Sequence, residues 1–166
     1  IGDITLSANV MPPGDRLRFF AGLAGNNQLS LNGDYYLDRE EDNIDAQLKI
    51  QQLQLKPMNR FVKGILTRLK GNLAGECKIS GSVSDPKFDA NLVLTALGFG
   101  VDFSNVRYHF PELKIHLTPD IVEIREAMFL DEIGNSATVF GSIKHNMFNN
   151  IDLEQLKVKT DRLLFT

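Results

Sequence analysis

Residues 77–92 read CKISGSVSDPKFDANL, and this stretch decides the fold. Its first seven letters follow the pattern apolar, any, apolar, any, Gly, any, apolar, which returns as LSLNGDY at 29–35 and as ATVFGSI at 137–143. After each copy comes a second alternating strand that carries an aspartate. These aspartates are Asp45, Asp89 and Asp152. Such repeats are typical of sheets extended by similar hairpins, so we expect an elongated β-structure whose surface, rather than a catalytic cluster, is the working part.

Period-two alternation of apolar residues dominates most of the chain, as in Ile4, Leu6, Ala8 and Val10. Strands with one apolar face usually close into a barrel or pair into a sandwich. A repeat that only adds strands favours a curled sheet, because twist accumulates with strand number. We therefore predict an all-β fold with one short helix, in which a long, twisted, antiparallel-type sheet curls into an open-sided, β-taco-like trough with an apolar interior.

Two segments break this alternation. Residues 57–71 place their apolar side chains on one helical stripe between Pro57 and Gly71, which predicts a short amphipathic helix. Its opposite face is basic, and two interpretations stay open: contact with an anionic membrane, or capping of one end or edge of the sheet. Near the end of the chain, parity changes between Leu153 and Leu156, which predicts a bulge or a register shift.

Composition excludes several classes of protein. The net charge is −3, with 18 basic and 21 acidic residues interspersed, which argues against nucleic acid as the main partner. The single cysteine, Cys77, is in phase with Ile79 and Val83 and is interpreted as a small buried hydrophobe. No apolar run approaches the roughly 20 residues of a membrane span. Because the chain starts at Ile1 and 162–166 reads as a strand in progress, we expect residues 1–166 to be one repeat-built β-groove segment of a longer protein.

The residue types that carry catalysis or bind metals do not form a recognisable pattern. The three histidines, His109, His116 and His145, lack metal-ligand spacing, and the first two sit on the polar side of alternating strands. The repeat aspartates occur singly, whereas a calcium loop needs several oxygens, so we expect them to face solvent. We predict no enzymatic activity, no catalytic residue, no metal and no cofactor.

The run LKGNLAGECKISGSVSDPKFDANL at 69–92 resembles the TamB family. The resemblance lies in the order of a short helix, Gly-x-Leu-x-Gly, an alternating strand and an Asp-Pro turn. Ser82 and Ala90 stand where the family commonly has Thr and Gly. Residues 130–148 also resemble the C-terminal region of that family, so the likeness covers roughly 57–166.

This resemblance implies a specific setting. TamB-like proteins are the inner-membrane subunits of the translocation and assembly module in diderm bacteria. They are anchored in the inner membrane, cross the periplasm and pair with an outer-membrane barrel of the TamA kind. Their repeats form a curled sheet with an apolar groove, and they are tied to phospholipid transport and outer-membrane protein assembly. AsmA-like bridge-type lipid transfer proteins share much of the pattern.

The leading hypothesis is a non-enzymatic segment whose apolar groove binds phospholipid acyl chains, with membrane attachment supplied by a part of the parent protein outside this segment. One alternative is a β-scaffold that binds nascent outer-membrane strands by edge pairing, and a second is an autotransporter or adhesin repeat. The residues predicted to line the groove are Leu29, Leu31, Tyr35, Leu37, Ile79, Val83, Phe88, Leu92, Phe99, Val101, Phe103, Val106, Tyr108, Phe110, Leu113, Ile115, Leu117, Val139 and Ile143.

Overall fold

The structure is a computed structural model that describes residues 2–60, 66–101, 106–147, 149–153, 155–160 and 162–163. These residues form eleven strands and one short 3-10 helix, η1. In chain order the elements are β1 (Asp3–Met11), β2 (Arg16–Ala24), β3 (Gln28–Tyr36), β4 (Ile44–Gln54), η1 (Lys56–Arg60), β5 (Leu66–Gly81), β6 (Pro86–Val101), β7 (Arg107–Leu117), β8 (Ile121–Asp131), β9 (Ser136–Asn146), β10 (Asn149–Asp152) and β11 (Leu156–Thr160).

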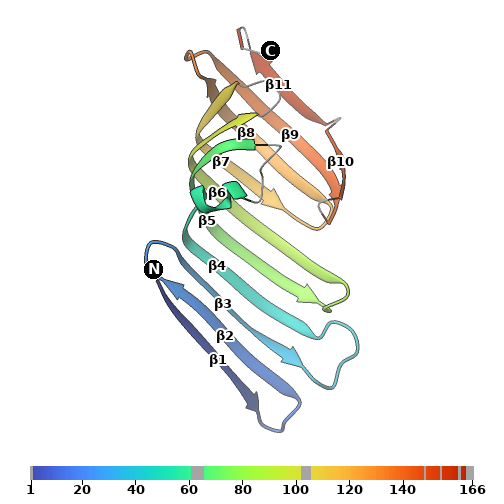
Figure 1. Cartoon of the computed structure of the whole chain (residues 1–166). Helices are drawn as coiled ribbons and strands as arrows, with labels where there is room; N and C mark the ends of the chain where they lie inside the picture. The colour runs from blue at the N-terminus through green and yellow to red at the C-terminus, as the bar shows by residue number, and fades with distance from the viewer. Residues whose placement is uncertain are drawn as a thin grey trace.

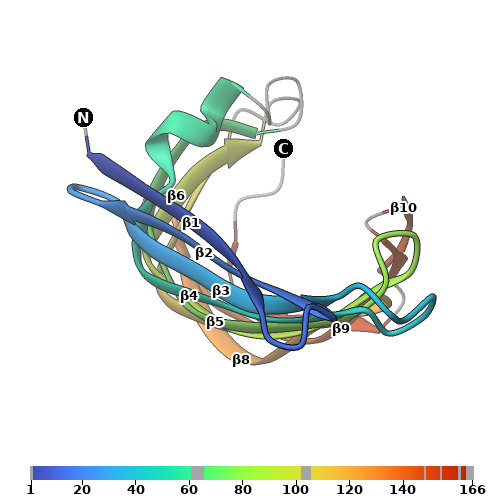
Figure 2. The ribbon, with the colours of Figure 1, turned by 90° about the horizontal axis from the view of Figure 1, so that it is seen from below.

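All the strands belong to one sheet. From β1 to β10 they follow one another in chain order, each antiparallel to its neighbours, and β11 lies off this path beside β9 (Figure 1). The sheet curves into an arc that stays open on one side (Figure 2). The prediction of an all-β fold built from one curled, open, antiparallel sheet is therefore confirmed. The predicted register shift near the end of the chain is also present, because Asp152 pairs with Lys144 of β9 whereas Leu156 pairs with Gly141, so the pairing moves by one residue between them.

The strand register carries the apolar residues across the whole sheet on one face. One cross-strand row runs without interruption from β1 to β9, because each member pairs directly with the next. Its members are Leu6, Ala21, Leu31, Leu48, Cys77, Ala90, Leu117, Val122 and Ile143. Side chains alternate between the two faces of a strand, so polar residues such as Asn32 and Lys78 occupy the other face.

The apolar face is the concave one. The described strands make a single layer, so a side chain can be buried only where curvature brings neighbouring side chains together. The buried hydrophobic residues Ala46, Ala90, Phe110, Phe129 and Val139 all belong to the apolar rows. We call this surface the concave face and its polar counterpart the convex face.

The glycine of the repeat is required where the strand bends. Gly81 and Gly141 have φ angles of 90° and 123°, values that disfavour residues with a side chain. A Cβ atom at Gly81 would lie 2.5 Å from the carbonyl oxygen of Asp85, and one at Gly141 would overlap the carbonyl oxygen of Gln155. Glycine in a strand interior marks such bends and close backbone approaches, which explains its recurrence in the repeat.

A line of bends, here called the crease, crosses β4 to β8. Where a strand crosses the crease, two successive inward-facing residues are three positions apart in the sequence instead of two. This spacing lets the strand bend while its apolar residues stay on the concave face. In β5 the crease is a bulge at Arg68 and Leu69, and in β6 and β7 both strands step together, so that their mutual register is unbroken. The other steps are Ile50 to Leu53, Leu94 to Leu97, Phe110 to Leu113 and Ile124 to Ala127.

The prediction of a helix over 57–71 is wrong for residues 66–71, which belong to a strand. Lys56–Arg60 forms the 3-10 helix η1, Leu66 onwards belongs to β5, and residues 61–65 lie outside the described part. The helical stripe had a different origin, since the bulge at Arg68 spaces inward-facing residues by more than two. Leu66 pairs with Val101 in β6, and strand pairing thus outweighs the local helical pattern.

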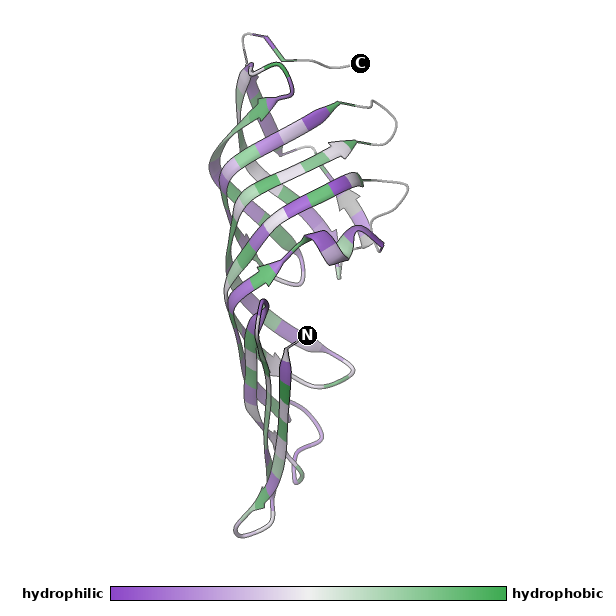
Figure 3. Ribbon diagram, turned by 60° about the vertical axis from the view of Figure 1, so that its left-hand side comes forward, coloured by the Kyte–Doolittle hydropathy of each residue, from purple (hydrophilic) through white to green (hydrophobic). Residues whose placement is uncertain are grey.

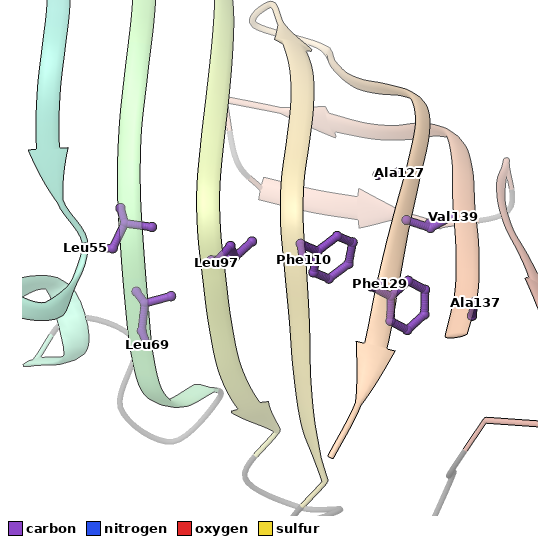
Figure 4. Close-up of a cluster of buried hydrophobic side chains, with 8 residues drawn as sticks. All are labelled: Leu55, Leu69, Leu97, Phe110, Ala127, Phe129, Ala137 and Val139. Carbon is purple, nitrogen blue, oxygen red and sulfur yellow. The ribbon is translucent and has the colours of Figure 1, made fainter. Parts of the chain in front are cut away.

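The main hydrophobic cluster lies between the crease and η1, across β5 to β9 (Figure 4). Its rings stack in a chain: the centroids of Phe99 and Phe110 are 6.1 Å apart, and those of Phe110 and Phe129 are 4.9 Å apart. The ring of Tyr108 meets Phe129 edge-on at 5.7 Å. Its buried members are Leu55, Leu69, Leu97, Phe110, Ala127, Phe129, Ala137 and Val139.

Candidate functional site

The concave face is the candidate functional site, because it presents a continuous apolar surface from β1 to β9. Apolar and polar residues alternate along the strands, so each strand contributes a set of apolar side chains to it (Figure 3). In the shared rows these sets line up from β1 to β9. Such a surface can shelter another apolar group from water.

Burial increases along the concave face from the first strand towards the crease. In the row that starts at Leu6, this first side chain is 74% exposed, whereas Ala90 in β6 is 2% exposed. In the flatter part of the sheet, the apolar side chains that β1 places on this face are exposed and those of β2 and β3 are half-buried, whereas Ala46 and Ile50 in β4 are already buried. Where β5 to β9 curl, the same rows pack against one another, and Phe110 is 8% exposed. The concave face thus has an open part and a packed part.

Most residues predicted to line the groove lie on the concave face. Val106 precedes β7 and is 3% exposed, and Val101 ends β6. Phe103 lies outside the described residues. The residues that the strand register places on the concave face are Leu29, Leu31, Tyr35, Ile79, Phe88, Leu92, Phe99, Tyr108, Phe110, Leu113, Ile115, Leu117, Val139 and Ile143.

Two of the predicted groove residues are corrected by the structure. Leu37 follows the end of β3 and is 54% exposed, and Val83 lies in the turn between β5 and β6 and is 75% exposed. Both continue the alternation of the preceding strand by one step, but the chain has already turned there. Alternation places a side chain on a face only while the strand lasts.

Sequence reasoning missed part of this surface. The alternation of β1 and β4 was visible, yet their residues were left out of the groove set, and the three-residue steps concealed the inward positions of β6 and β8. A step of three between apolar residues in neighbouring strands is the signal that would have found them. The additional concave residues include Ile4, Leu6, Val10, Phe19, Ala46, Leu48, Ile50, Leu73, Ala90, Leu94, Leu97, Val122, Ile124, Ala127, Phe129 and Ala137.

Cys77 behaves as the predicted small hydrophobe. It occupies the concave row between Leu48 and Ala90, and burial raises the pKa of its thiol. A raised pKa keeps the thiol protonated and unreactive at neutral pH. The cysteine is therefore a packing residue of the concave face.

The convex face carries the polar groups of the repeat. Asp45 and Asp89 are exposed, as predicted. His116 lies between two carboxylates, with Nε2 at 3.2 Å from Asp89 and Nδ1 at 3.4 Å from Glu123. The two ring nitrogens point to different carboxylates, so the trio cannot converge on one cation. Within the described residues, no group of three or more His, Cys, Asp or Glu side chains is placed to hold a metal ion.

Ion pairs on the convex face tie neighbouring strands together. Arg18 in β2 donates to Asp34 in β3 at 2.9 Å, and Arg16 lies 3.6 Å from the same carboxylate. The hydrogen bond from Arg18 lowers the pKa of Asp34, so this carboxylate stays ionised. Exposed pairs of this kind add little to stability, and their main effect is to keep this face soluble.

Comparisons with family models, with curated proteins and with solved structures found no match for this chain. Among the described residues, no helix has both the length and the apolar character needed to cross a membrane. Any functional statement therefore rests on the geometry of the concave face and on the sequence resemblance described above.

Proposed function

We propose that this chain is a non-enzymatic lipid-handling segment of a TamB-like cell-envelope protein, whose concave face shelters phospholipid acyl chains between the inner and outer membranes. The observation that carries the proposal is the unbroken apolar row from Leu6 to Ile143 in a sheet that stays open on one side. A soluble domain normally covers such a surface, and large exposed apolar patches are typical of sites that bind a membrane, a protein or an apolar ligand.

The dimensions and energetics suit an acyl chain. Ten strand positions at a spacing of about 4.8 Å give a face roughly 45 Å long. Each methylene withdrawn from water contributes about 0.8 kcal/mol, so a chain of about 16 carbons gains up to about 12 kcal/mol before ordering costs. The open part at β1 to β3 is where such a chain would replace water, since the curled part is already filled by its own side chains.

The wider setting follows from the resemblance and forms part of the proposal. The parent protein would be anchored in the inner membrane of a diderm bacterium, with this segment in the periplasm. Its partner would be an outer-membrane barrel of the TamA type, and its role would include outer-membrane protein assembly. These statements rest on the sequence resemblance at 69–92 and 130–148.

Photo-crosslinking in the cell envelope tests the proposal. We expect a photoreactive amino acid at Leu31, on the concave face, to capture phospholipid, because an acyl chain would lie against it. The matched control is Asn32, the next residue, which is exposed on the convex face. Lipid capture at Leu31 and not at Asn32, detected by mass spectrometry of organic extracts, would support the proposal. Equal capture at both positions, or none at Leu31, would refute it.

A second candidate function is favoured by the β1 edge. Ile4, Leu6 and Val10 are 73%, 74% and 62% exposed, and within the described residues β1 pairs with β2 alone. An edge strand with free backbone groups and an apolar face can accept another strand. The segment would then be a scaffold for nascent outer-membrane strands. Trapping of such polypeptides instead of lipid at Leu6 and Leu31 would favour it over lipid handling.

A further inference from the structure

A hollow near η1 is lined by three basic residues together with residues from both faces of the sheet. It has a volume of about 360 Å³ and lies over the ends of β5 to β8 that face the η1 side of the sheet. Gly98 and His109 pair with each other on the convex side, whereas Phe99, Tyr108 and Asp131 come from the concave side, so both faces contribute to the hollow. Its lining residues are Arg68, Lys70, Gly98, Phe99, Arg107, Tyr108, His109, Asp131 and Glu132. We call it the basic hollow.

Glycine forms the floor of the basic hollow. A Cβ atom at Gly98 would lie 2.6 Å from Cε of Lys70, which means that the lysine side chain runs directly across this glycine. Nearby, a Cβ atom at Gly100 would lie 2.6 Å from the hydroxyl oxygen of Thr67. The side chain of Lys70 therefore occupies the space that a side chain at position 98 would need, so this arrangement depends on glycine there.

The bulge at Arg68 is stabilised by hydrogen bonds from η1. Arg68 has a φ angle of 54°, a conformation that is unfavourable for a residue with a side chain. The side-chain amide of Asn59 fixes the bulge, because it donates to the carbonyl oxygen of Leu69 and accepts from the Leu69 amide, each at 2.7 Å. A glycine at position 68 would remove the strain, so the structure maintains an arginine there at a cost.

The cations of the basic hollow are poorly neutralised. Within the described part of the chain, neither Arg68 nor Lys70 forms an ion pair. Nε of Arg107 lies 3.9 Å from the Glu132 carboxylate, a long and exposed contact that leaves the rest of the guanidinium available.

The second carboxylate of the hollow is already engaged. Asp131 accepts hydrogen bonds from the backbone amides of Ile133 and Asn135 and from the side-chain amide of Asn135. Its register with Tyr108 also places it on the concave side. Three cations therefore face a single available carboxylate, that of Glu132.

We propose that the basic hollow binds a phosphate-type anion, supplied either by a lipid headgroup or by a soluble phosphate. Two guanidinium groups offer paired donors that match phosphate oxygens, and the ammonium group of Lys70 adds a point charge beside them. The site lies at the ends of β5 to β8, whereas Leu31 lies in β3. It therefore stands or falls independently of lipid capture at Leu31.

The test compares two double variants that remove the same charge. R68Q/K70Q removes two cations of the hollow, whereas K49Q/K78Q removes two exposed cations of the convex face in β4 and β5, away from it. Inorganic phosphate is titrated into each protein at low ionic strength while the amide resonances of Gly98, Gly100 and His109 are followed by NMR. An unchanged amide pattern elsewhere in the spectrum shows that each variant is folded.

We expect phosphate to shift these three resonances in the unmodified protein. R68Q/K70Q should weaken the binding by about tenfold for each cation removed, and K49Q/K78Q should leave it unchanged. Sedimentation with phosphatidylcholine vesicles, with and without phosphatidylglycerol, separates the two sources of phosphate. Retention that needs phosphatidylglycerol, Arg68 and Lys70 assigns a headgroup, and phosphate binding without such retention assigns a soluble ligand. The proposal is overturned if phosphate moves none of the three resonances, or if both double variants lose binding equally.

Discussion

Glycines with similar backbone angles are required for different reasons in this chain. Gly141 and Gly134 both have positive φ angles, 123° and 89°, so any side chain is strained at either position. They differ in their surroundings. A Cβ atom at Gly141 would overlap the backbone of Gln155, whereas one at Gly134 meets no atom within 4 Å. Gly141 is therefore required by both conformation and space, and Gly134 by conformation alone.

Replacement by alanine separates these two requirements. We expect Gly134→Ala to lower the free energy of unfolding by about 1 kcal/mol, the usual cost of a left-handed residue. Gly141→Ala should lower it by about 3 kcal/mol, because the backbone of β9 or of the segment at Gln155 must also move. Urea denaturation of both variants measures the difference. Equal losses would show that the repeat glycine serves backbone conformation only.

At the level of single residues, the sequence predicted faces well and strand ends poorly. Leu31 and Ile115 were assigned to the correct face because alternation fixes the direction of every second side chain. Leu37 and Val83 were misplaced because the pattern runs one step past the strand, where burial depends on the turn. The basic hollow could not be predicted either, since Arg68 and Arg107 are brought together only by the pairing of β5, β6 and β7.

The course of strands β4 to β8 depends on the crease as much as on the repeat. The crease lets β4 to β8 bend, and each strand crosses it with a three-residue step between inward positions. In a sequence, a step of three is also the mark of a helix, so the segment at 57–71 was interpreted as one. The long-range pairing of Leu66 and Lys70 with β6 decides the outcome and is not encoded in that segment alone.

Asn59 in η1 is the residue that links this short helix to the crease. Besides its two bonds to the backbone of Leu69, it donates to the carbonyl oxygen of Lys56 at 2.7 Å. We expect Asn59→Ala to lower the free energy of unfolding by about 2 kcal/mol, because partly buried backbone groups of the bulge lose their partner.

Hydrogen exchange locates the effect of this substitution. The Leu69 amide should exchange faster in Asn59→Ala, whereas amides of β2 and β3 should keep their protection. The matched control is Asn32→Ala, a change of the same kind at an exposed position of β3, which should stay within about 0.5 kcal/mol of the unmodified protein. If the Leu69 amide keeps its protection, the bulge does not depend on η1.

At the scale of the whole molecule, the sheet combines a packed part with an open part on one continuous face. The repeat alone was enough to predict the curl and the apolar interior, because uniform parity and accumulating twist apply to every strand. It could not predict where the face is packed. That depends on the crease, on the contribution of Leu55 from the β4–η1 connection, and on the stacking of Phe110 and Phe129.

An arginine substitution should lower stability strongly in the packed part and hardly at all in the open part. Phe110→Arg would place an unpaired charge among stacked rings at a site that is 8% exposed, and should cost about 4 kcal/mol of stability. Leu6→Arg lies in the apolar face at a site that is 74% exposed, so the charge stays hydrated and stability should change by less than about 0.5 kcal/mol.

Lipid capture and stability should respond differently to these two substitutions, so measuring both tests the role of the concave face. If the open part receives an acyl chain, Leu6→Arg keeps the fold and still reduces lipid capture at Leu31, because the two side chains share one cross-strand row through Ala21. Thermal melting and photo-crosslinking are measured on the same samples, with Ser7→Arg on the opposite face of β1 as the matched control. A Leu6→Arg variant that melts normally and captures lipid as well as the control would mean that the open part of the concave face is not the lipid path.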